Sequence, residues 1–322
     1  MQSKKTYKII IILLAITVFV LSFFSLFIGY DGVNISTDNN IIKLRIIRVI
    51  LAVIAGSSLA ISGASLQGIF NNHLADPHLL GISAAAALGA CVNIAFLNYN
   101  FMFNIVFALI GSLIILIIIF YIIHKYNTKI VTQLLIIGFI VNSFCSSIIS
   151  VLKIALTPQK SQNILFWLTG QINIVSNLHL IISIIVFIIG VCILLKYKSE
   201  LEIISFGEEE AYLLGINSPY VIKITIFANC LLISNVVIFA GVIGFIGLVI
   251  PNLIRLFGYF DLRLLLPLSA LSGGLCLMFF DSISRLSFYF FSTEIPTGSL
   301  CSLLLSPIFI WLFLRMNNVS NY

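Results

Sequence analysis

Few side chains in this sequence could carry out catalysis, and none of them forms a recognisable catalytic or metal-binding pattern. The four histidines, His73, His78, His124 and His179, include no HExxH pair and have no acidic partner at the spacing of metal ligands. The sequence has no GxxxxGK[ST] motif, so a nucleotide-binding P-loop is not expected. We therefore expect no catalytic residue, no bound metal and no cofactor in this chain.

The most informative charged residues are arginines that lie close to the ends of apolar runs. Arg45 and Arg48 are three residues apart and therefore share one face of a helix. Two roles suit them: they extend to the lipid headgroups, or their planar guanidinium groups bind carboxylates of another protein. Arg285 lies four residues after Asp281, and this spacing predicts an ion pair within one helix.

The elements that position these residues lie in a membrane, because the composition excludes a soluble globular domain. The chain of 322 residues is 61% hydrophobic and 9% charged, and its mean hydropathy is +1.18. Its formal net charge of +6 comes from basic residues scattered singly at the ends of apolar runs, which indicates membrane topology and not nucleic-acid binding. The six cysteines lie inside apolar runs without a CxxC pair, so neither a disulfide framework nor a zinc site is expected.

Ten apolar runs predict a polytopic all-α membrane protein with one transmembrane domain over residues 1–322. An even number of spans places both termini on one side, and the distribution of lysine and arginine favours cytoplasmic termini. The first run lacks a signal-peptide cleavage site and is interpreted as a retained span. Ten spans also permit an inverted repeat of five plus five, without a convincing residue-level repeat. The predicted spans are 9–28, 46–66, 79–97, 101–123, 133–153, 178–195, 221–240, 242–258, 264–286 and 298–314, with a short interfacial helix at 162–170.

One long polar segment, Glu200–Lys223, interrupts the apolar runs and carries five of the eleven acidic residues. Ser205 and Glu208 have the spacing of a capping box, which predicts a helix that begins after Ser205. Gly215 predicts a left-handed residue that ends this helix, and Ser218-Pro219 predicts the N-cap and first position of the next one. Two short helices joined by a sharp bend would form a docking element outside the membrane.

Three stretches place small or polar residues inside apolar runs, where such residues allow close helix packing or line a water-filled cavity. Packing alone accounts for the glycines, and less easily for the Asp-Pro pair in the second stretch. A translocation path is the functional interpretation, and close packing against a neighbouring helix is the structural one. The candidate path residues are Ser62, Gly63 and Gln67 in the first stretch, Asp76, Pro77, Gly81 and Ser83 in the second, and Gly244, Gly247 and Pro251 in the third.

A secondary active transporter with an intramembrane carboxylate site is an alternative function, because such transporters bind ions or protons near the membrane midplane. Asp76 and Asp281 are the candidate carboxylates, and both lie near the ends of predicted spans. An intramembrane enzyme would need a convergent catalytic cluster, and the sequence shows none.

Several motifs occur in order along nearly the whole chain: LRIIR at 44–48 with ISGA at 61–64, LADPHLLGIS at 74–83, GEEEAYLLG at 207–215, IGFIGLVIPNLIR at 243–255, LPLSA at 266–270 and EIPTG at 294–298. In these motifs the sequence resembles the FecCD-type permease subunits of binding-protein-dependent ABC importers, which import iron–siderophore complexes, haem and cobalamin. It departs from the family pattern at Asn72-His73, Asn252 and Ser306-Pro307, and these departures concern gate or packing details.

The resemblance implies an ABC type II importer permease that moves an iron chelate or a cobalamin-like ligand by alternating access, in the bacterial plasma (inner) membrane. The bent helices at about 200–220 correspond to coupling helices that dock on two ATP-binding subunits, which hold ATP and Mg²⁺. Arg45, Arg48 and Arg285 correspond to outward arginines that dock glutamates of an extracytoplasmic substrate-binding protein. A second permease copy or a paralogue would enclose the path. The coupling residues implied are Gly207, Glu208, Glu209, Ala211, Leu214 and Gly215.

Overall fold

The computed structural model describes residues 4–29, 32–33, 39–97, 101–125, 130–173 and 176–319, and several side chains within these ranges, among them that of Glu208, lie outside this description. The described chain is almost entirely helical, apart from the two-residue strands β1 (Ile28–Gly29) and β2 (Gly32–Val33), which pair antiparallel. The helices are α1 (Lys4–Ser25), α2 (Asn39–Ile69), η1 (Pro77–Leu80), α3 (Ile82–Phe96), α4 (Phe101–Lys125), α5 (Ile130–Ala155), α6 (Pro158–Leu168), α7 (Asn177–Lys196), α8 (Lys198–Ile204), α9 (Glu208–Leu213), α10 (Ser218–Ala240), α11 (Ile246–Leu256), α12 (Leu262–Phe291) and α13 (Thr297–Val319).

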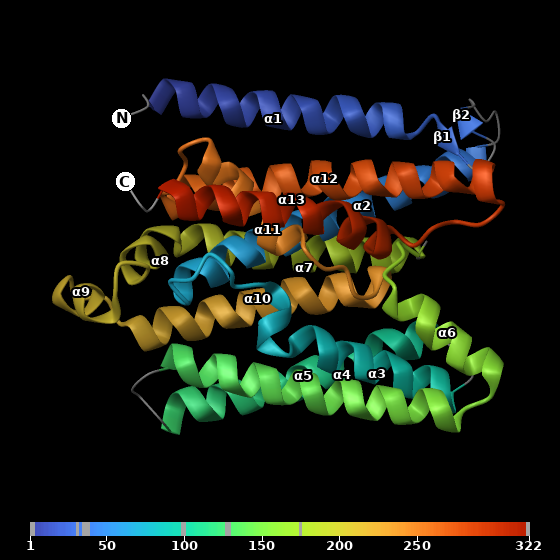
Figure 1. The fold of residues 1–322 in the computed structure, drawn as a ribbon, viewed down its shortest axis with the longest axis horizontal. Coiled ribbons are helices and arrows are strands. Elements are labelled where there is room, and N and C mark those ends of the chain that lie inside the picture. The colour runs from blue at the N-terminus through green and yellow to red at the C-terminus, as the bar shows by residue number, and fades with distance from the viewer. Residues whose placement is uncertain are drawn as a thin grey trace.

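Most of the helices run along one long axis of the molecule, and both termini lie at the same end of it (Figure 1). We call this the α9 end, because α8 and α9 lie there too. The opposite end carries α6 and the β1–β2 pair, and we call it the α6 end. Helix α2 packs against α10, α11 and α12, whereas α3, α4 and α5 form a layer on the other side of α10. The two termini therefore lie on one side of any membrane that these helices cross.

The predicted all-helical membrane architecture is confirmed. Six described helices are long and apolar enough to cross a membrane, and four shorter apolar helices account for the other predicted runs. The prediction of a span over 242–258 is wrong, because the chain between α10 and α11 is not helical and α11 has only eleven residues. Eleven residues extend about 16 Å, roughly half the thickness of the hydrocarbon core. Gly241 and Phe245 both have left-handed φ angles, 67° and 69°, which interrupt the helix before α11.

Small residues allow α2 to approach its neighbours to backbone contact. A Cβ atom built on Gly56 would lie 2.1 Å from the Gly273 carbonyl oxygen of α12. A Cβ atom on Gly63 would lie 1.9 Å from the Gly247 carbonyl oxygen of α11. No side chain fits at either position unless a helix moves, so the packing interpretation of the small-residue stretches holds within the chain.

Replacing Gly63 with alanine should therefore destabilise the protein, by at least the 1–3 kcal/mol or so that is typical of overpacked cores. The added methyl group meets backbone atoms, which cannot rotate away as a side chain would. Gly244→Ala is the matched control, because a Cβ atom there would meet only the Ser302 hydroxyl, at 3.9 Å. Thermal unfolding of the two variants in detergent measures the difference, and equal unfolding temperatures would contradict this prediction.

The bent pair of helices at 200–220 exists, but two of its predicted caps are wrong. Ser205 ends α8, where its hydroxyl donates to the Glu202 carbonyl at 2.6 Å, and so it does not form a capping box. The N-cap of α9 is Gly207. The N-cap of α10 is Asn217, whose side chain accepts from the Tyr220 N–H. The capping box does not form because Ser205 has helical φ and ψ angles of −66° and −16°, whereas a serine N-cap needs an extended backbone.

The predicted left-handed end of α9 is confirmed. Gly215 has a φ of 76°, and its N–H donates to the Tyr212 carbonyl at 2.9 Å. The next N–H, of Ile216, donates to the Ala211 carbonyl at 2.9 Å. Together these two hydrogen bonds form a Schellman motif, which turns the chain sharply and directs it into α10.

Candidate functional sites

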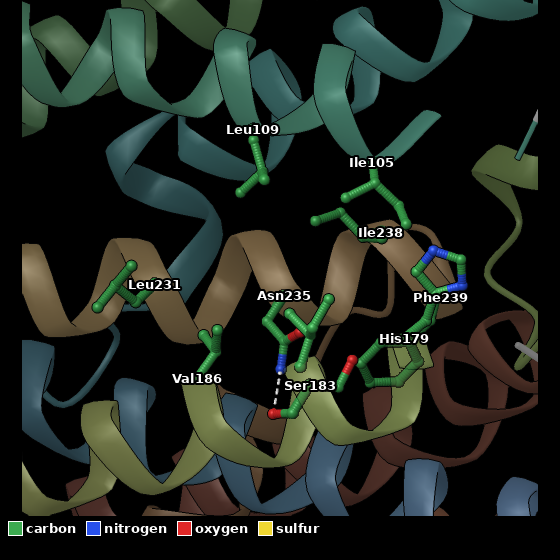
Figure 2. Close-up of a pocket in the computed structure, with 10 residues that line it drawn as sticks. Ile105, Leu109, His179, Ser183, Val186, Leu231, Asn235, Ile238 and Phe239 are labelled. Atoms are coloured by element: carbon green, nitrogen blue, oxygen red, sulfur yellow. Dashed lines mark hydrogen bonds between the residues drawn. The ribbon is translucent and has the colours of Figure 1, made fainter. Parts of the chain in front are cut away.

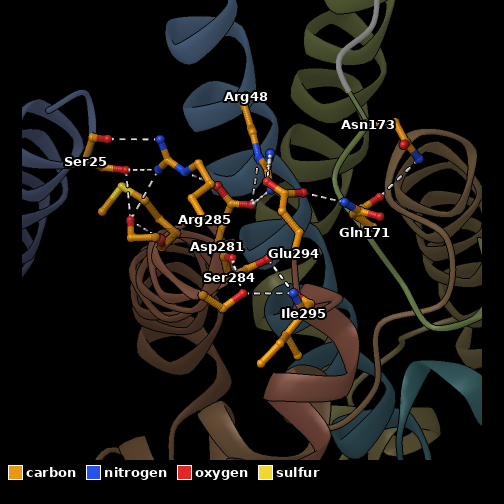
Figure 3. Close-up of polar contacts among 12 residues, drawn as sticks. Ser25, Arg48, Gln171, Asn173, Asp281, Ser284, Arg285, Glu294 and Ile295 are labelled. Atoms are coloured by element: carbon orange, nitrogen blue, oxygen red, sulfur yellow. Dashed lines mark hydrogen bonds and ion pairs between the residues drawn. The ribbon is translucent and has the colours of Figure 1, made fainter. Parts of the chain in front are cut away.

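Four charged side chains from α2, α12 and the connection to α13 meet at one place (Figure 3). Arg48 of α2 donates from Nε to Asp281 Oδ1 at 3.0 Å and from Nη1 to Glu294 Oε1 at 2.9 Å. Arg285 Nε lies 3.2 Å from Asp281 Oδ2, so the ion pair predicted from their spacing is confirmed. Arg48, Asp281 and Arg285 are 3%, 0% and 2% exposed, and the Glu294 side chain is 10% exposed. We call these four residues the outer ion network.

The outer ion network connects segments that are far apart in the sequence. Arg285 Nη1 donates to the Ser25 carbonyl at 3.0 Å, and Nη2 donates to the Ser25 hydroxyl, which attaches the end of α1. Gln171 Nε2 donates to Glu294 Oε2 at 2.5 Å, which attaches the segment after α6. Two positive and two negative charges balance, so each charge is compensated by its neighbours. Removing one member would leave an uncompensated charge inside the protein.

The three arginines that were predicted to dock a binding protein have different environments in the structure. Arg48 and Arg285 face inward, and their guanidinium groups contact carboxylates of the same chain. Arg45 keeps part of its surface exposed, and its Nη1 donates to the Leu26 carbonyl at 2.9 Å. Of the three arginines, therefore, only Arg45 reaches the surface in this conformation. Sequence spacing could not show this, because Asp281 and Glu294 lie more than two hundred residues away in sequence from Arg48.

The first candidate path stretch packs inside the chain. Ser62 and Gln67 are buried. Gln67 Nε2 lies 3.4 Å from the Leu248 carbonyl, and Gln67 Oε1 accepts a hydrogen bond from Arg255, both in α11. Together with the contact of Gly63, these hydrogen bonds hold α2 against α11.

The third candidate stretch forms the other side of this contact. Gly247 and Pro251 are buried in α11, and a Cβ atom on Gly247 would lie 2.6 Å from Pro77 Cδ. Gly244 differs from them, because it has open space beside it and lies before the helix begins.

The second candidate stretch forms the turn between α2 and α3. The Asp76 carboxylate accepts the His78 N–H at 2.8 Å, and Pro77 begins η1, so local capping explains the Asp-Pro pair. Gly81 ends η1 with a φ of 75°, and Ser83 is buried in the first turn of α3. The structure therefore brings Gly63, Gln67 and Pro77 together against α11, whereas Gly81 packs against Val141 of α5.

Exposed apolar side chains lie on α9 and in the residues that flank it on either side. Tyr212, Leu213 and Leu214 are 80%, 83% and 68% exposed, and Phe206 is 69% exposed. We call these four side chains the α9 patch. Ala211 is fully buried on the opposite side of the helix. Because α9 is too short to span a membrane and projects from the α9 end (Figure 1), the α9 patch has the character of a protein-binding surface.

Glu202 connects α8 to the beginning of α12. Its Oε2 accepts the Leu262 N–H at 2.5 Å, which satisfies one of the free donors in the first turn of α12. Burial raises the pKa of the Glu202 carboxyl, and Asp261 raises it further. A displacement of α8 would therefore act directly on the start of α12.

A small cavity lies between α4, α7 and α10 (Figure 2). Its volume is about 80 Å³, and Asn235 Nδ2 donates to the Ser183 carbonyl beside it at 3.1 Å. A larger groove of about 430 Å³ runs between α3, α4 and α5 and is lined by aliphatic and aromatic side chains. The first is too small for a drug-sized ligand, and the second lacks the polar groups that orient one.

The profile of the FecCD transport family, which describes ABC importer permeases, matches residues 6–315 of this chain. The chain belongs to the FecCD transport family. As a permease subunit it is a membrane component of an ABC importer, and it is not an enzyme.

Individual FecCD permeases and a solved structure agree with this assignment. The chain is 35% identical to the haemin transport system permease HmuU of Yersinia pestis, over 85% of this chain and 83% of that protein. It is 32% identical to the cobalamin import permease BtuC of Halobacterium salinarum, over 84% of this chain and 72% of that protein. A solved structure, described as an inward-facing ABC transporter of the metal-chelate type, superposes with a TM-score of 0.86 at 28% identity. That match covers 96% of this chain and 99% of the solved one.

Sequence reasoning about this FecCD permease missed one polar surface. Four serines of α5, Ser143, Ser146, Ser147 and Ser150, are exposed along a helix that is mostly apolar. Their spacing of three and four residues places them along one side of the helix, and we call them the α5 serine stripe. This spacing is present in the sequence and could have been found by searching each predicted span for polar periodicity.

Proposed function

We propose that this permease forms one wall of an import path for an iron chelate, either a siderophore complex or haem. The observation that carries this proposal is the exposed α5 serine stripe. Lipid does not solvate hydroxyl groups, so polar residues on a membrane helix face protein or a water-filled path. A haemin permease, a cobalamin permease and a transporter of the metal-chelate type are among the similar proteins, and of these ligand classes an iron chelate is the one that we propose.

The hydroxyl groups of the stripe suit a path that a ligand leaves quickly. Ser147 Oγ donates to the Ser143 carbonyl at 2.8 Å, and Ser150 Oγ donates to the Ser146 carbonyl at 2.9 Å. Because these two protons are used within the helix, Ser147 and Ser150 present weak acceptors, and none of the four serines carries a charge. Such a wall wets the path and holds a chelate only weakly.

A second copy of the permease, or a paralogue, would supply the opposite wall. Helix α13 also shows serines at its surface, with Ser299 exposed and Ser302 and Ser306 half-buried. Neither of the two cavities described above could hold a chelate within one chain. A path between two subunits would use the faces of α5 and α13 without requiring an internal channel.

The remaining partners follow from the two ends of the molecule. The α9 patch would bind an ATPase subunit on the cytoplasmic side, where both termini would then lie, and ATP and Mg²⁺ would be held by that subunit. The α6 end would receive an extracytoplasmic substrate-binding protein at Arg45 and its neighbours. The candidate path residues Ser62, Gly63, Gln67 and Gly247 would act as a rigid connection between the two ends.

The alternative of a secondary transporter receives no support from the geometry. Asp76 caps η1, and Asp281 is held between two arginines. A carboxylate that binds and releases a proton or sodium ion needs an environment in which it can change partners, and neither of these has one.

Thiol labelling of the reconstituted importer tests the path. Ser146→Cys in a background without native cysteines should react with a membrane-impermeant maleimide, and a ferric siderophore or haem presented by the binding protein should slow this reaction. Ile185→Cys in α7 is the matched control, because Ile185 is 51% exposed on a helix whose exposed side chains are almost all apolar. Equal labelling at the two positions, or none at either, would contradict a wetted path along α5.

A further inference from the structure

We propose that Glu294 takes the place of a carboxylate of the binding protein. Its ion pair with Arg48 would last until the binding protein docks and a carboxylate of that protein displaces Glu294. The inference rests on the proposed function, because it requires that a binding protein docks at the α6 end. It explains why an arginine that resembles a docking residue is 3% exposed in this conformation.

The contacts show which side of Arg48 is open to exchange. The Nε and Nη2 atoms of Arg48 both lie 3.0 Å from Asp281 Oδ1, on the side facing α12. Nη1 points the other way and donates to Glu294 Oε1 at 2.9 Å. The Asp281 side chain is fully buried, whereas the Glu294 side chain retains 10% exposure. A carboxylate that arrives from outside would therefore meet Arg48 at the position of Glu294.

Charge balance makes the exchange feasible for Glu294 and not for Asp281. Asp281 compensates both Arg48 and Arg285, so its departure would leave two buried guanidinium groups facing each other. Glu294 contacts Arg48 and the neutral Gln171, so one external carboxylate would restore the balance that its departure removes. The exchange conserves the number of charge-assisted hydrogen bonds to Arg48.

The position of Glu294 connects this exchange to the proposed path. Glu294 lies in the connection between α12 and α13, which hydrogen bonds attach to α12 and to the segment after α6. The Ile295 N–H donates to Ser287 Oγ at 2.9 Å, and Ser284 Oγ donates to the Ile295 carbonyl at 2.6 Å. Two residues into α13, the Gly298 N–H donates to the Gly170 carbonyl at 2.8 Å. Release of Glu294 would remove the contacts to Arg48 and Gln171 and so loosen the first turn of α13, and with it the serines that face the path.

Removing the charge of Glu294 tests directly whether it takes the place of a binding-protein carboxylate. In the full importer, Glu294→Gln should bind the substrate-free binding protein about tenfold more tightly at low salt, because the competing carboxylate is gone. The same variant should unfold at a lower temperature than the wild type, because Arg48 loses a partner. Ser287→Ala is the matched control: it loosens the same connection without a change of charge, and its docking affinity should stay within about twofold of the wild type.

The outcomes distinguish this inference from the proposed function. If the wild-type importer does not bind the binding protein at all, the proposed function fails. If the wild type binds and Arg48→Gln weakens binding, but Glu294→Gln binds no more tightly than the wild type, this inference is wrong. If Glu294 is purely structural, Glu294→Gln should lower both the stability and the docking affinity. If Glu294 takes the place of a binding-protein carboxylate, the same variant should lower the stability and raise the docking affinity.

Hydrogen exchange in the unmodified importer provides a measurement that needs no variant. Docking should speed up exchange of the Ile295 and Gly298 amides, because their connection is released from Arg48. A docking surface ordinarily slows exchange in the segments that it covers. Slower or unchanged exchange at these two amides on addition of the binding protein would overturn the proposal.

Discussion

Replacing Asp281 with asparagine should destabilise the permease by about 3–5 kcal/mol, the range measured when one partner of a buried ion pair is removed. Asp281 is fully buried and contacts both Arg48 and Arg285, at 3.0 and 3.2 Å. Asparagine keeps the shape of the side chain but removes the charge, so two guanidinium groups would share one remaining carboxylate, Glu294. The loss should appear as a large fall in unfolding temperature in detergent.

A surface pair provides the control for this prediction. Arg263 lies 3.8 Å from Asp261, and both side chains are more than 40% exposed. Arg263→Gln should cost at most about 1 kcal/mol, because water solvates the remaining carboxylate. The double variant Asp281→Asn with Arg285→Gln restores the charge balance and should recover part of the lost stability. If Asp281→Asn and Arg263→Gln unfold at the same temperature, the outer ion network does not stabilise the fold.

Replacing Leu213 with aspartate should abolish coupling to the ATPase, with at least a tenfold loss of ATP-dependent uptake. Leu213 is 83% exposed at the centre of the α9 patch, and buried apolar anchors at protein interfaces typically contribute 2 kcal/mol or more each. The side chain makes little contact within its own chain, so the fold should be preserved. Co-purification of the ATPase and uptake in proteoliposomes measure the two effects.

The control for the α9 patch is Leu213→Met, which keeps the volume and the apolar character of the side chain. It should retain the ATPase and most of the uptake. Ala211 is unsuitable for this test although sequence analysis implied a coupling role, because it is fully buried and a larger side chain would disrupt α9 itself. Normal ATPase binding by Leu213→Asp would show that the ATPase docks elsewhere.

Local patterns predicted two elements correctly whose determining contacts are local. The Schellman end of α9 needed only Gly215 and its immediate neighbours, and the pair of Asp281 and Arg285 needed only their spacing on one helix. The capping box at Ser205 failed because the cap depends on the direction in which α8 enters the turn. The span over 242–258 failed because apolar composition does not show where the backbone stops being helical.

The role of the glycines shows a different limit. Gly63 and Gly247 were predicted to allow close packing or to line a path, and the structure places them against each other inside one chain. The sequence could not choose between these alternatives, since both need a small residue and only the neighbour distinguishes them. The α5 serine stripe, in contrast, could have been predicted from the spacing of its serines in the sequence. The prediction would have needed only the further assumption that this helix is partly exposed.

The sequence by itself determined that this protein is a helical membrane protein and a FecCD permease, because hydropathy, chain length and ordered motifs are properties of the chain alone. Only the tertiary structure decided which charges are compensated. Arg48 has the same sequence signal as Arg45, yet Arg48 is buried against Asp281 and Glu294 while Arg45 reaches the surface. The physical reason is that the energy of a charge inside a protein depends on its distance from other charges and from water. Those distances are fixed by how α2, α12 and the connection to α13 pack together.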